Sequence, residues 1–263
     1  MRLLHKDLTY KIRGCIFAVH NELKTGFNEE SYHLALENRL DKNNISFQSK
    51  PFCFLEHRGI KVHKFIPDLI VEDKVILELK NIQSDFIPAN YLQIISYLKH
   101  WQKDLGLLVN FGVLTPNIER ILFSEKELIL YENYMEIEDF IISNDRQHFE
   151  NTRSTILNIF EIFGLGYAYS MYKSLFQVEL AHQNIAFAPS IFLPVKVEGQ
   201  LLKNFELKVP LIANKILCGI TAGQKDLKIH KASMKNYLRK ANIPIGMIAN
   251  FGKEKLEIIG VHP

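Results

Sequence analysis

The segment that decides the fold spans residues 66–80 and reads IPDLIVEDKVILELK. Its two apolar runs are separated by charged turn residues at 72–74, which predicts a pair of adjacent antiparallel strands. Side chains alternate between the two faces of a strand, so Glu78 and Lys80 share one face. The same alternation places Asp68 among apolar neighbours in the preceding strand. We therefore expect two carboxylates and one ammonium group to converge on one patch of the sheet.

Carboxylates at such a place need a compensating cation, because burying them unpaired costs several kcal/mol. Mg²⁺ binds hard oxygen ligands and typically takes one or two protein carboxylates, so Asp68 and Glu78 are candidate metal ligands for Mg²⁺ or Mn²⁺. Hydrolysis of a phosphodiester requires an activated water and a countercharge at phosphorus. A metal supplies the first, and the metal with Lys80 supplies the second.

The elements around this segment predict an α/β sandwich with the order αα-βββ-α-β. Asn28 is a candidate N-cap for the second helix, with Glu29 and Glu30 in its first turn. The expected helices cover residues 8–23, residues that follow Asn28, and residues 88–103. The expected strands cover residues 47–56, 60–71, 74–80 and 105–110.

The chain repeats itself with an offset of about 140 residues. Tyr97-Leu98, Gly106 and Asn110-Phe111-Gly112 recur as Tyr237-Leu238, Gly246 and Asn250-Phe251-Gly252. The repeat predicts two lobes of one fold, at residues 1–127 and 153–263. Residues 128–152 are the expected connector, and they carry one basic and six acidic residues.

Two further polar residues of the first copy are candidates for the same site. Glu29 lies three residues before Tyr32 on the helix stripe that faces the core, where an acid needs a partner. Gln93 precedes Tyr97 by one helical turn, so it is expected to point toward the site. The competing interpretation treats Glu29 as an acid that stabilises the helix start and Gln93 as a structural residue. For Tyr97 the structural interpretation is favoured, because its counterpart Tyr237 is kept in the copy that lost the site.

These residues carry a family resemblance over about residues 8–123. The ordered motifs are Gly26-x-x-Glu29-x-x-Tyr32, Pro67-Asp68, Glu78-Leu79-Lys80, Gln93-x-x-x-Tyr97-Leu98 and Gly106 to Gly112. This set resembles the GxxExxY group of the PD-(D/E)XK nuclease superfamily. The resemblance implies a restriction-endonuclease-like core in each lobe. It also implies that Asp68 and Glu78 bind metal, that Lys80 is the catalytic lysine, and that Glu29, Gln93 and Tyr97 have supporting roles.

The second copy departs from the motif. With a one-residue gap left open, Asp68 corresponds to Lys208 or Val209, Glu78 to Cys218 or Gly219, and Lys80 to Ile220 or Thr221. Glu29 corresponds to Tyr169, and Gln93 to Ser233. Residues 153–263 are therefore expected to form an inactive lobe that keeps the scaffold without the ligands.

Charge is distributed unevenly, with a net charge of +1 for residues 1–127, −5 for 128–152 and +7 for 153–263. The basic second half predicts contact with the phosphates of nucleic acid, with salt-dependent affinity. A solvated helix face is the competing interpretation. The candidate nucleic-acid-binding residues are Lys225, Lys228, Lys231, Lys235, Arg239 and Lys240, and His230 lies among them.

The leading functional hypothesis is a Mg²⁺- or Mn²⁺-dependent phosphodiesterase that acts on DNA in preference to RNA. A non-catalytic nucleic-acid-binding or adaptor protein on the same fold is the alternative. The expected assembly is a monomeric pseudo-dimer, with a homodimer left open. The 263-residue chain contains no apolar run of membrane-spanning length, no signal peptide and no paired cysteines, so we expect it in the cytoplasm without a membrane partner.

Overall fold

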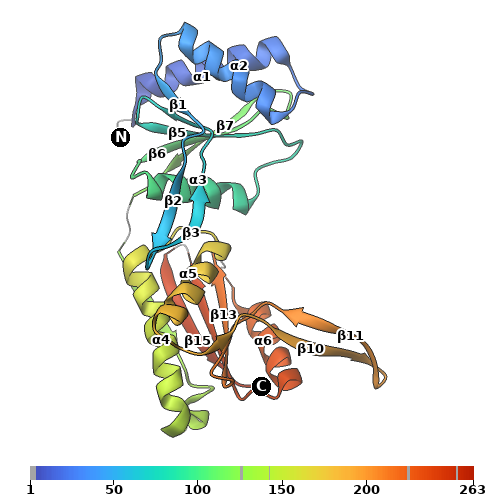
Figure 1. Ribbon diagram of the computed structural model, residues 1–263. Coiled ribbons are helices and arrows are strands. Elements are labelled where there is room, and N and C mark those ends of the chain that lie inside the picture. Colours follow the sequence, from blue (N-terminus) through green and yellow to red (C-terminus); the bar gives the residue numbers. More distant parts are fainter. Residues whose placement is uncertain (1–3, 125–126, 142, 224–225, 253) are drawn as a thin grey trace. The chain divides into compact units, whose positions relative to one another are not determined.

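A computed structural model describes residues 4–124, 127–141, 143–223, 226–252 and 254–263 (Figure 1). The chain divides into two compact units. The first comprises Met1–Leu55 and His63–Glu125, and the second comprises Glu56–Val62 and Lys126–Pro263. Among the described residues, none of the helices combines the length and the apolar character that a membrane span requires.

The first unit is a five-stranded sheet with helices on both faces (Figure 1). Its helices are α1 (Lys6–Leu23), α2 (Glu29–Lys42) and α3 (Pro88–His100). Its strands are β1 (Phe47–Ser49), β4 (Leu69–Val71), β5 (Val75–Lys80), β6 (Leu105–Asn110) and β7 (Asn117–Leu122), in the sheet order β1-β4-β5-β6-β7. A separate hairpin consists of β2 (Cys53–His57) and β3 (Ile60–Phe65). This architecture confirms the predicted α/β sandwich.

The alternation along β5 sorts its side chains between the two helical layers. Leu77 and Leu79 belong to the buried core that α1 and α2 share with the sheet. Gly106 on the adjacent strand β6 faces α3, because a Cβ atom there would lie 2.6 Å from the Ile94 side chain. Glu78 pairs in parallel register with Leu108, so it alternates onto the α3 side of the sheet. The prediction that Glu78 and Lys80 share a face holds because β5 is an unbroken strand.

Two of the expected strands are interrupted, and the prediction of single strands there was wrong. Residues 47–56 contain β1 and the start of β2, and residues 60–71 contain β3 and β4. Pro67 lies at the second break, where its missing N–H prevents it from donating to a ladder. Asp68 therefore lies in the bend that precedes β4, and the alternation from Ile60 does not determine its direction.

The second unit repeats this topology. Its helices are α4 (Ser143–Phe163), α5 (Tyr169–His182) and α6 (Lys228–Ala241), with a 3₁₀ turn at Glu138–Phe140. Its sheet has the order β8-β15-β14-β13-β12-β9. The strands are β8 (Ile129–Asn133), β9 (Phe187–Ala188), β12 (Leu211–Ile212), β13 (Ile216–Ala222), β14 (Ile245–Phe251) and β15 (Lys255–Val261). A hairpin again stands apart, formed by β10 (Ile191–Val197) and β11 (Gln200–Leu207).

Residues 128–152, the expected connector, carry regular structure in this unit. β8 pairs in parallel with β15 and extends the second sheet by one strand beyond the first. The first half of α4 follows it. The acidic segment thus contributes to the fold of the second unit.

One stacked ring pair recurs in both units and explains part of the sequence repeat. Tyr32 stacks on Phe111 with ring centroids 4.7 Å apart, and its hydroxyl donates to the carbonyl oxygen of Lys24 at 2.6 Å. Tyr172 stacks on Phe251 at 3.9 Å, and its hydroxyl donates to the carbonyl oxygen of Gly164 at 2.7 Å. Each pair fastens the second helix of a lobe to the end of a buried strand, β6 in the first unit and β14 in the second, so the matching residues serve the scaffold.

Candidate active site

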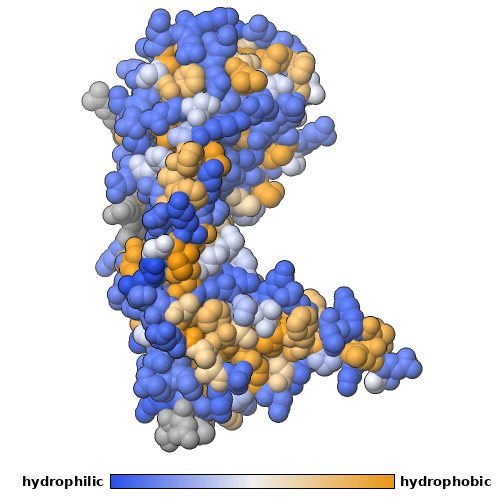
Figure 2. Space-filling model, viewed as in Figure 1, coloured by the Kyte–Doolittle hydropathy of each residue, from blue (hydrophilic) through white to orange (hydrophobic). Residues whose placement is uncertain are grey.

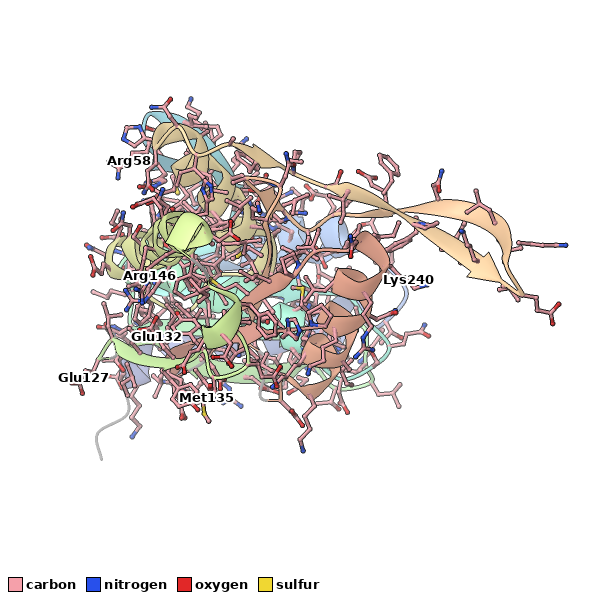
Figure 3. The ribbon with its side chains drawn as sticks, turned by 90° about the horizontal axis from the view of Figure 1, so that it is seen from below. Arg58, Glu127, Glu132, Met135, Arg146 and Lys240 are labelled. Carbon is pink, nitrogen blue, oxygen red and sulfur yellow. The ribbon has the colours of Figure 1, made fainter. Side chains whose placement is uncertain are left out.

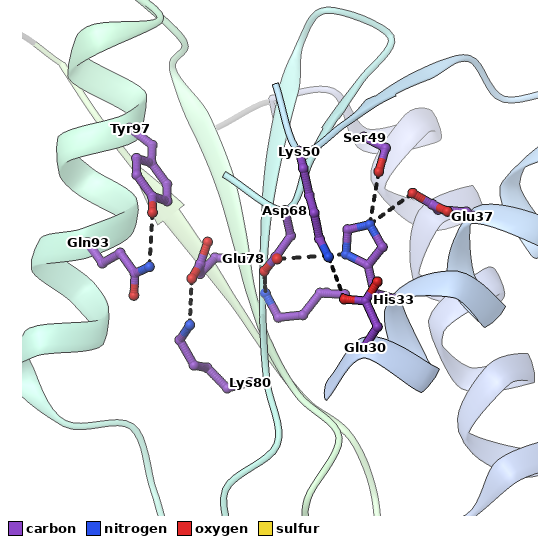
Figure 4. Close-up of polar contacts among 11 residues, drawn as sticks. Glu30, His33, Glu37, Ser49, Lys50, Asp68, Glu78, Lys80, Gln93 and Tyr97 are labelled. Atoms are coloured by element: carbon purple, nitrogen blue, oxygen red, sulfur yellow. Dashed lines mark hydrogen bonds and ion pairs between the residues drawn. The ribbon is translucent and has the colours of Figure 1, made fainter. Parts of the chain in front are cut away.

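Glu78 and Lys80 form an ion pair at the end of β5 (Figure 4). The Glu78 side chain is 3% exposed and that of Lys80 is 15% exposed, and the Lys80 Nζ lies 2.5 Å from the Glu78 Oε1. Their spacing of two along a strand brings the pair together, as the sequence predicts. Both groups are held in a largely dry environment at the α3 side of the sheet.

Asp68 joins this pair from the bend before β4. Its Oδ2 accepts a hydrogen bond from the backbone N–H of Leu79 at 2.7 Å, so the aspartate is anchored to the strand that carries Glu78 and Lys80. Its Oδ1 lies 3.7 Å from the His33 Nδ1, which comes from α2 (Figure 4). A backbone hydrogen bond across the β4–β5 pair therefore directs Asp68 toward the site.

The site contains more acidic than basic groups, and the pKa shifts of its carboxyl groups reflect this. Burial, and after it the nearby Asp68, raise the pKa of Glu78 to about 8 against the opposing effect of Lys80. Burial also raises the pKa of Glu29, and Lys80 lowers it while Asp68 raises it again. Three carboxyl groups thus influence one another around a single ammonium group.

Lys80 is held in its charged form. Burial by itself would lower the pKa of this lysine, but the Glu78 carboxylate beside it reverses the effect, and Glu29 and Asp68 act in the same direction. The net result is a pKa above the ordinary lysine value. At neutral pH Lys80 is therefore an ammonium group that donates hydrogen bonds and accepts no proton.

The donor set fits a hard divalent cation. The Glu78 Oε2 is buried and has no hydrogen-bond partner among the described residues. No group of three or more His, Cys, Asp or Glu side chains arranged to hold a metal is found in the described part of the chain. Mg²⁺ does not require one, because it commonly takes one or two protein carboxylates and completes its shell with water and phosphate oxygens. Asp68 and Glu78 are the residues that would hold such an ion.

The two predicted supporting residues, Glu29 and Gln93, lie on different helices, α2 and α3. Glu29 is the first residue of α2, and Asn28 caps that helix by accepting from the Ser31 N–H at 2.9 Å. Gln93 on α3 donates from Nε2 to the Tyr97 hydroxyl at 3.0 Å (Figure 4). Burial and then the Glu78 carboxylate raise the pKa of Tyr97 to about 12. Gln93 therefore contacts Tyr97, whose hydroxyl feels the charge of Glu78, and its supporting role stays a prediction.

Sequence reasoning missed His33, which lies beside Asp68. This histidine is buried, and its Nε2 contacts Glu37 Oε1 at 2.9 Å and the Ser49 hydroxyl at 3.1 Å. The Asp68 carboxylate, 3.7 Å from Nδ1, raises the pKa of His33 above its ordinary value. The available signal was its spacing, because His33 follows Glu29 by four residues and so lies on the same helix face.

A second missed feature is the clamp that holds the end of β5. The Asn110 side chain accepts from the Ile82 N–H at 3.0 Å and donates to the Ile82 carbonyl oxygen at 2.9 Å. Gly112 is required beside it, since a Cβ atom there would lie 2.5 Å from the Ile82 carbonyl oxygen. The repeated Asn-Phe-Gly motif therefore fixes the segment that follows Lys80.

The strand register of the second unit resolves the gap left open by the sequence. Lys80 pairs with Asn110 across β5 and β6, and Thr221 pairs with Asn250 across β13 and β14. Since Asn110 and Asn250 are 140 residues apart, Lys80 corresponds to Thr221. The same register assigns Val209 to Asp68 and Gly219 to Glu78. The second lobe thus has no ionisable group at the three positions.

The predicted nucleic-acid-binding residues are partly neutralised within the second unit. Lys231 and Lys235 both pair with Glu136, at 2.6 and 3.1 Å, and Lys228 lies 3.8 Å from Asp226. Arg239 and Lys240 are exposed in the last turn of α6. Lys225 lies outside the described residues.

Other ion pairs join the acidic segment to the basic half of the chain. Arg153 pairs with Glu132 at 2.6 Å, and Lys215 lies 3.4 Å from Asp145. The hydrogen bonds from Arg153 lower the pKa of Glu132. The charge asymmetry of the sequence is therefore partly balanced inside the unit, which leaves Arg239 and Lys240 as the stronger candidates for phosphate contact.

Comparison with known proteins identifies the family of the chain. The sequence model of the PD-(D/E)XK nuclease superfamily matches the chain twice, at residues 6–121 and 146–261. The chain belongs to the PD-(D/E)XK nuclease superfamily. No curated protein matches it. A solved structure described as "Crystal structure of SSO0001" is similar with 15% identity and a TM-score of 0.29, covering 59% of this chain and 94% of that one.

Proposed function

We propose that the protein is a metal-dependent phosphodiesterase that hydrolyses nucleic acid, DNA in preference to RNA, at Asp68, Glu78 and Lys80. The observation that carries the proposal is the buried Glu78 carboxylate. One of its oxygens contacts Lys80, and the other has no hydrogen-bond partner among the residues described. A divalent ion shared with Asp68 would satisfy that oxygen and offset the surplus negative charge.

The proposal extends to the subgroup and to the supporting residues. Gly26, Glu29 and Tyr32 stand at the spacing of the GxxExxY group, to which we assign the first lobe. Glu29 and Gln93 take supporting roles at the site. The chain contains one such centre, because its second lobe carries Val209, Gly219 and Thr221 at the corresponding positions. A single centre suits nicking or trimming of one strand.

Each residue has a definable task in the reaction. A divalent ion, when bound, polarises a phosphate oxygen and lowers the pKa of a water molecule. Lys80, as an ammonium group, donates to the phosphate oxygens while the water oxygen attacks phosphorus, and the P–O ester bond breaks as the leaving oxygen takes a proton from solvent water. Glu29, whose pKa burial raises, accepts the proton that the water releases. His33 and the Leu79 N–H hold Asp68 in place.

The purified chain is expected to cleave plasmid DNA in the presence of Mg²⁺ or Mn²⁺ and to stop when a chelator is added. In calorimetry, Glu78→Gln and Asp68→Asn should each weaken Mn²⁺ binding by about tenfold or more, because a carboxylate ligand is lost. Asp73→Asn is the matched control, since Asp73 lies at the opposite end of β5 and pairs with Lys103.

Two outcomes would contradict the proposal. One is DNA binding that is indifferent to chelators and to both site variants, which would favour the non-catalytic adaptor. The other is cleavage that survives Asp68→Asn and Glu78→Gln together, because a metal held by these residues would then be dispensable.

Phosphate contact by α6 is a separate part of the proposal. Reversing Arg239 and Lys240 to Glu should weaken DNA affinity at low salt and reduce the slope of log affinity against log salt by about 2. Reversing Lys231 and Lys235 should have a smaller effect, because Glu136 already balances their charge. Fluorescence anisotropy over a salt series measures both, and equal slopes for all variants would rule out contact by this helix.

A further inference from the structure

Ion pairs with Glu179 hold the tip of the β2–β3 hairpin in place. Residues Glu56–Val62 belong to the second unit. There the buried carboxylate of Glu179 on α5 accepts hydrogen bonds from Arg58 and contacts His57. Arg58 donates from Nε and Nη2 to the two Glu179 oxygens, each at 2.9 Å, and the His57 Nε2 lies 2.6 Å from Oε2. The His57 ring also packs edge-on against Phe163 at the end of α4. A hairpin tip of this protein is thus a docking element for a helix pair.

The second lobe carries the same hairpin, and the tip of this hairpin is exposed. Arg58-Gly59 and Glu198-Gly199 occupy the same two-residue turn, with positive φ at all four residues, so the tips correspond residue for residue. Large apolar side chains of β10 and β11 are exposed, among them Phe192 at 70%, Leu202 at 64% and Val197 at 55% (Figure 2). The hairpin extends past Lys240 of α6 with side chains on both faces (Figure 3). The base of the hairpin packs into the core with α6 through Leu193 and Leu207, whereas its exposed outer part gains stability from being covered.

The charges of the docking pair are reversed between the lobes. The offset of 140 carries Arg58 to Glu198 and Glu179 to Arg39, and α2 and α5 correspond over their full 14-residue lengths. A β10–β11 tip with Glu198 is therefore complementary to α2 with Arg39. It would be repelled by α5 with Glu179, just as Arg58 would be repelled by α2. The reversal permits contact only between unlike lobes.

The first unit has a cavity at the place that corresponds to the Glu179 site. A cavity of about 870 Å³ lies against α1 and α2, and Arg39 and Asn43 line it, the counterparts of Glu179 and Gln183. Its lining contains five basic residues and one acid, Asp7, so it favours an acidic tip. Arg39 pairs with Glu22 at 2.8 Å, but Glu22 is 69% exposed, and an exposed pair of this kind is readily exchanged.

From these observations we infer that the β10–β11 hairpin of one chain docks on α1 and α2 of a second copy, with Glu198 bound by Arg39. Val197 and the exposed leucines of the hairpin lie against the apolar part of the cavity wall. Two such contacts made reciprocally by one pair of chains close a homodimer, whereas one contact between each pair of neighbouring chains builds a head-to-tail assembly. The same surfaces serve both forms.

Sedimentation velocity of the full chain over a dilution series tests this inference. The wild type is expected to self-associate, and Glu198→Arg or Arg39→Glu should each weaken association by about tenfold or more. The double variant Glu198→Arg/Arg39→Glu should restore the association constant to within a few-fold of the wild-type value. Glu127→Arg makes the same charge change at an exposed residue away from the hairpin (Figure 3) and should leave association unchanged.

Cross-linking separates a second copy from a contact within one chain. A chain with Glu198→Cys is mixed with a different chain with Arg39→Cys and treated with a short bismaleimide, and a covalent heterodimer is expected. A wild type that stays monomeric at every concentration overturns the inference. So does association that is unaffected by both single charge reversals, or a mixture that yields no heterodimer above the wild-type background.

Discussion

Replacing Lys80 by alanine is expected to lower the rate of metal-dependent DNA cleavage by about 100- to 1,000-fold. This is the size of effect that follows when one donor aimed at developing negative charge is removed from a dry site. Lys80 meets that description, because it is largely buried and the Glu78 carboxylate keeps its pKa above the ordinary lysine value. Single-turnover cleavage of a defined DNA duplex measures the loss.

The same variant should bind Mn²⁺ at least as tightly as the wild type. Removal of the ammonium group frees the Glu78 Oε1 and leaves the carboxylates of the site with more uncompensated charge. Calorimetry then separates Lys80 from the metal ligands, since Glu78→Gln should lose both binding and cleavage. Lys103→Ala is the control, because Lys103 pairs with Asp73 near the start of β5. A wild-type rate of DNA cleavage by Lys80→Ala would show that this lysine takes no part in the mechanism.

Replacing Glu179 by alanine is expected to destabilise the second unit by about 3–5 kcal/mol. Removing one partner of a buried ion pair leaves the other charges uncompensated. Glu179 is fully buried and receives His57, Arg58 and Gln183. The midpoint of urea unfolding should fall accordingly, and Glu161→Ala, at an exposed position of α4, should change it little.

The pH dependence of this contribution has a defined sign. Hydrogen bonds from Arg58 lower the pKa of Glu179 to about 2, from an ordinary value of 4.5. A carboxyl group with a lowered pKa in the folded state binds fewer protons there, so its stabilisation is complete above pH 4.5 and is lost as the pH falls toward 2. The difference in unfolding free energy between wild type and Glu179→Ala should shrink across that range. A constant difference would show that the ion pairs contribute little.

The interrupted strands show where pattern reasoning fails. Alternation over residues 60–71 placed Asp68 inside a strand, whereas Pro67 ends that regularity and Asp68 lies in a bend. Its position beside Glu78 depends on the hydrogen bond from the Leu79 N–H, which comes from the neighbouring strand. A period of two cannot be carried through a break in the ladder. Asp68 nevertheless lies beside the strand of Glu78, because β4 and β5 pair in antiparallel register.

The charge pattern shows a different limit. The basic second half suggested an external anionic partner, but Glu132, Glu136 and Asp145 of the acidic segment pair with basic residues of the same unit. Net charge along a sequence does not reveal which charges meet after folding. The sequence shows that the repeat replaces Arg58 by Glu198 and Glu179 by Arg39. This exchange of charge can be interpreted only once the structure shows that Arg58 contacts Glu179.

The sequence by itself determined the duplicated α/β order, the Asn28 cap and the shared face of Glu78 and Lys80. These are local properties, because backbone geometry imposes the periods of helices and strands on any segment that forms them. Tertiary structure alone decided the position of Asp68, the presence of His33 at the site and the pairing of the acidic segment. Those depend on groups far apart in the chain, whose meeting is governed by the packing of whole elements and by the cost of leaving charge buried without a partner.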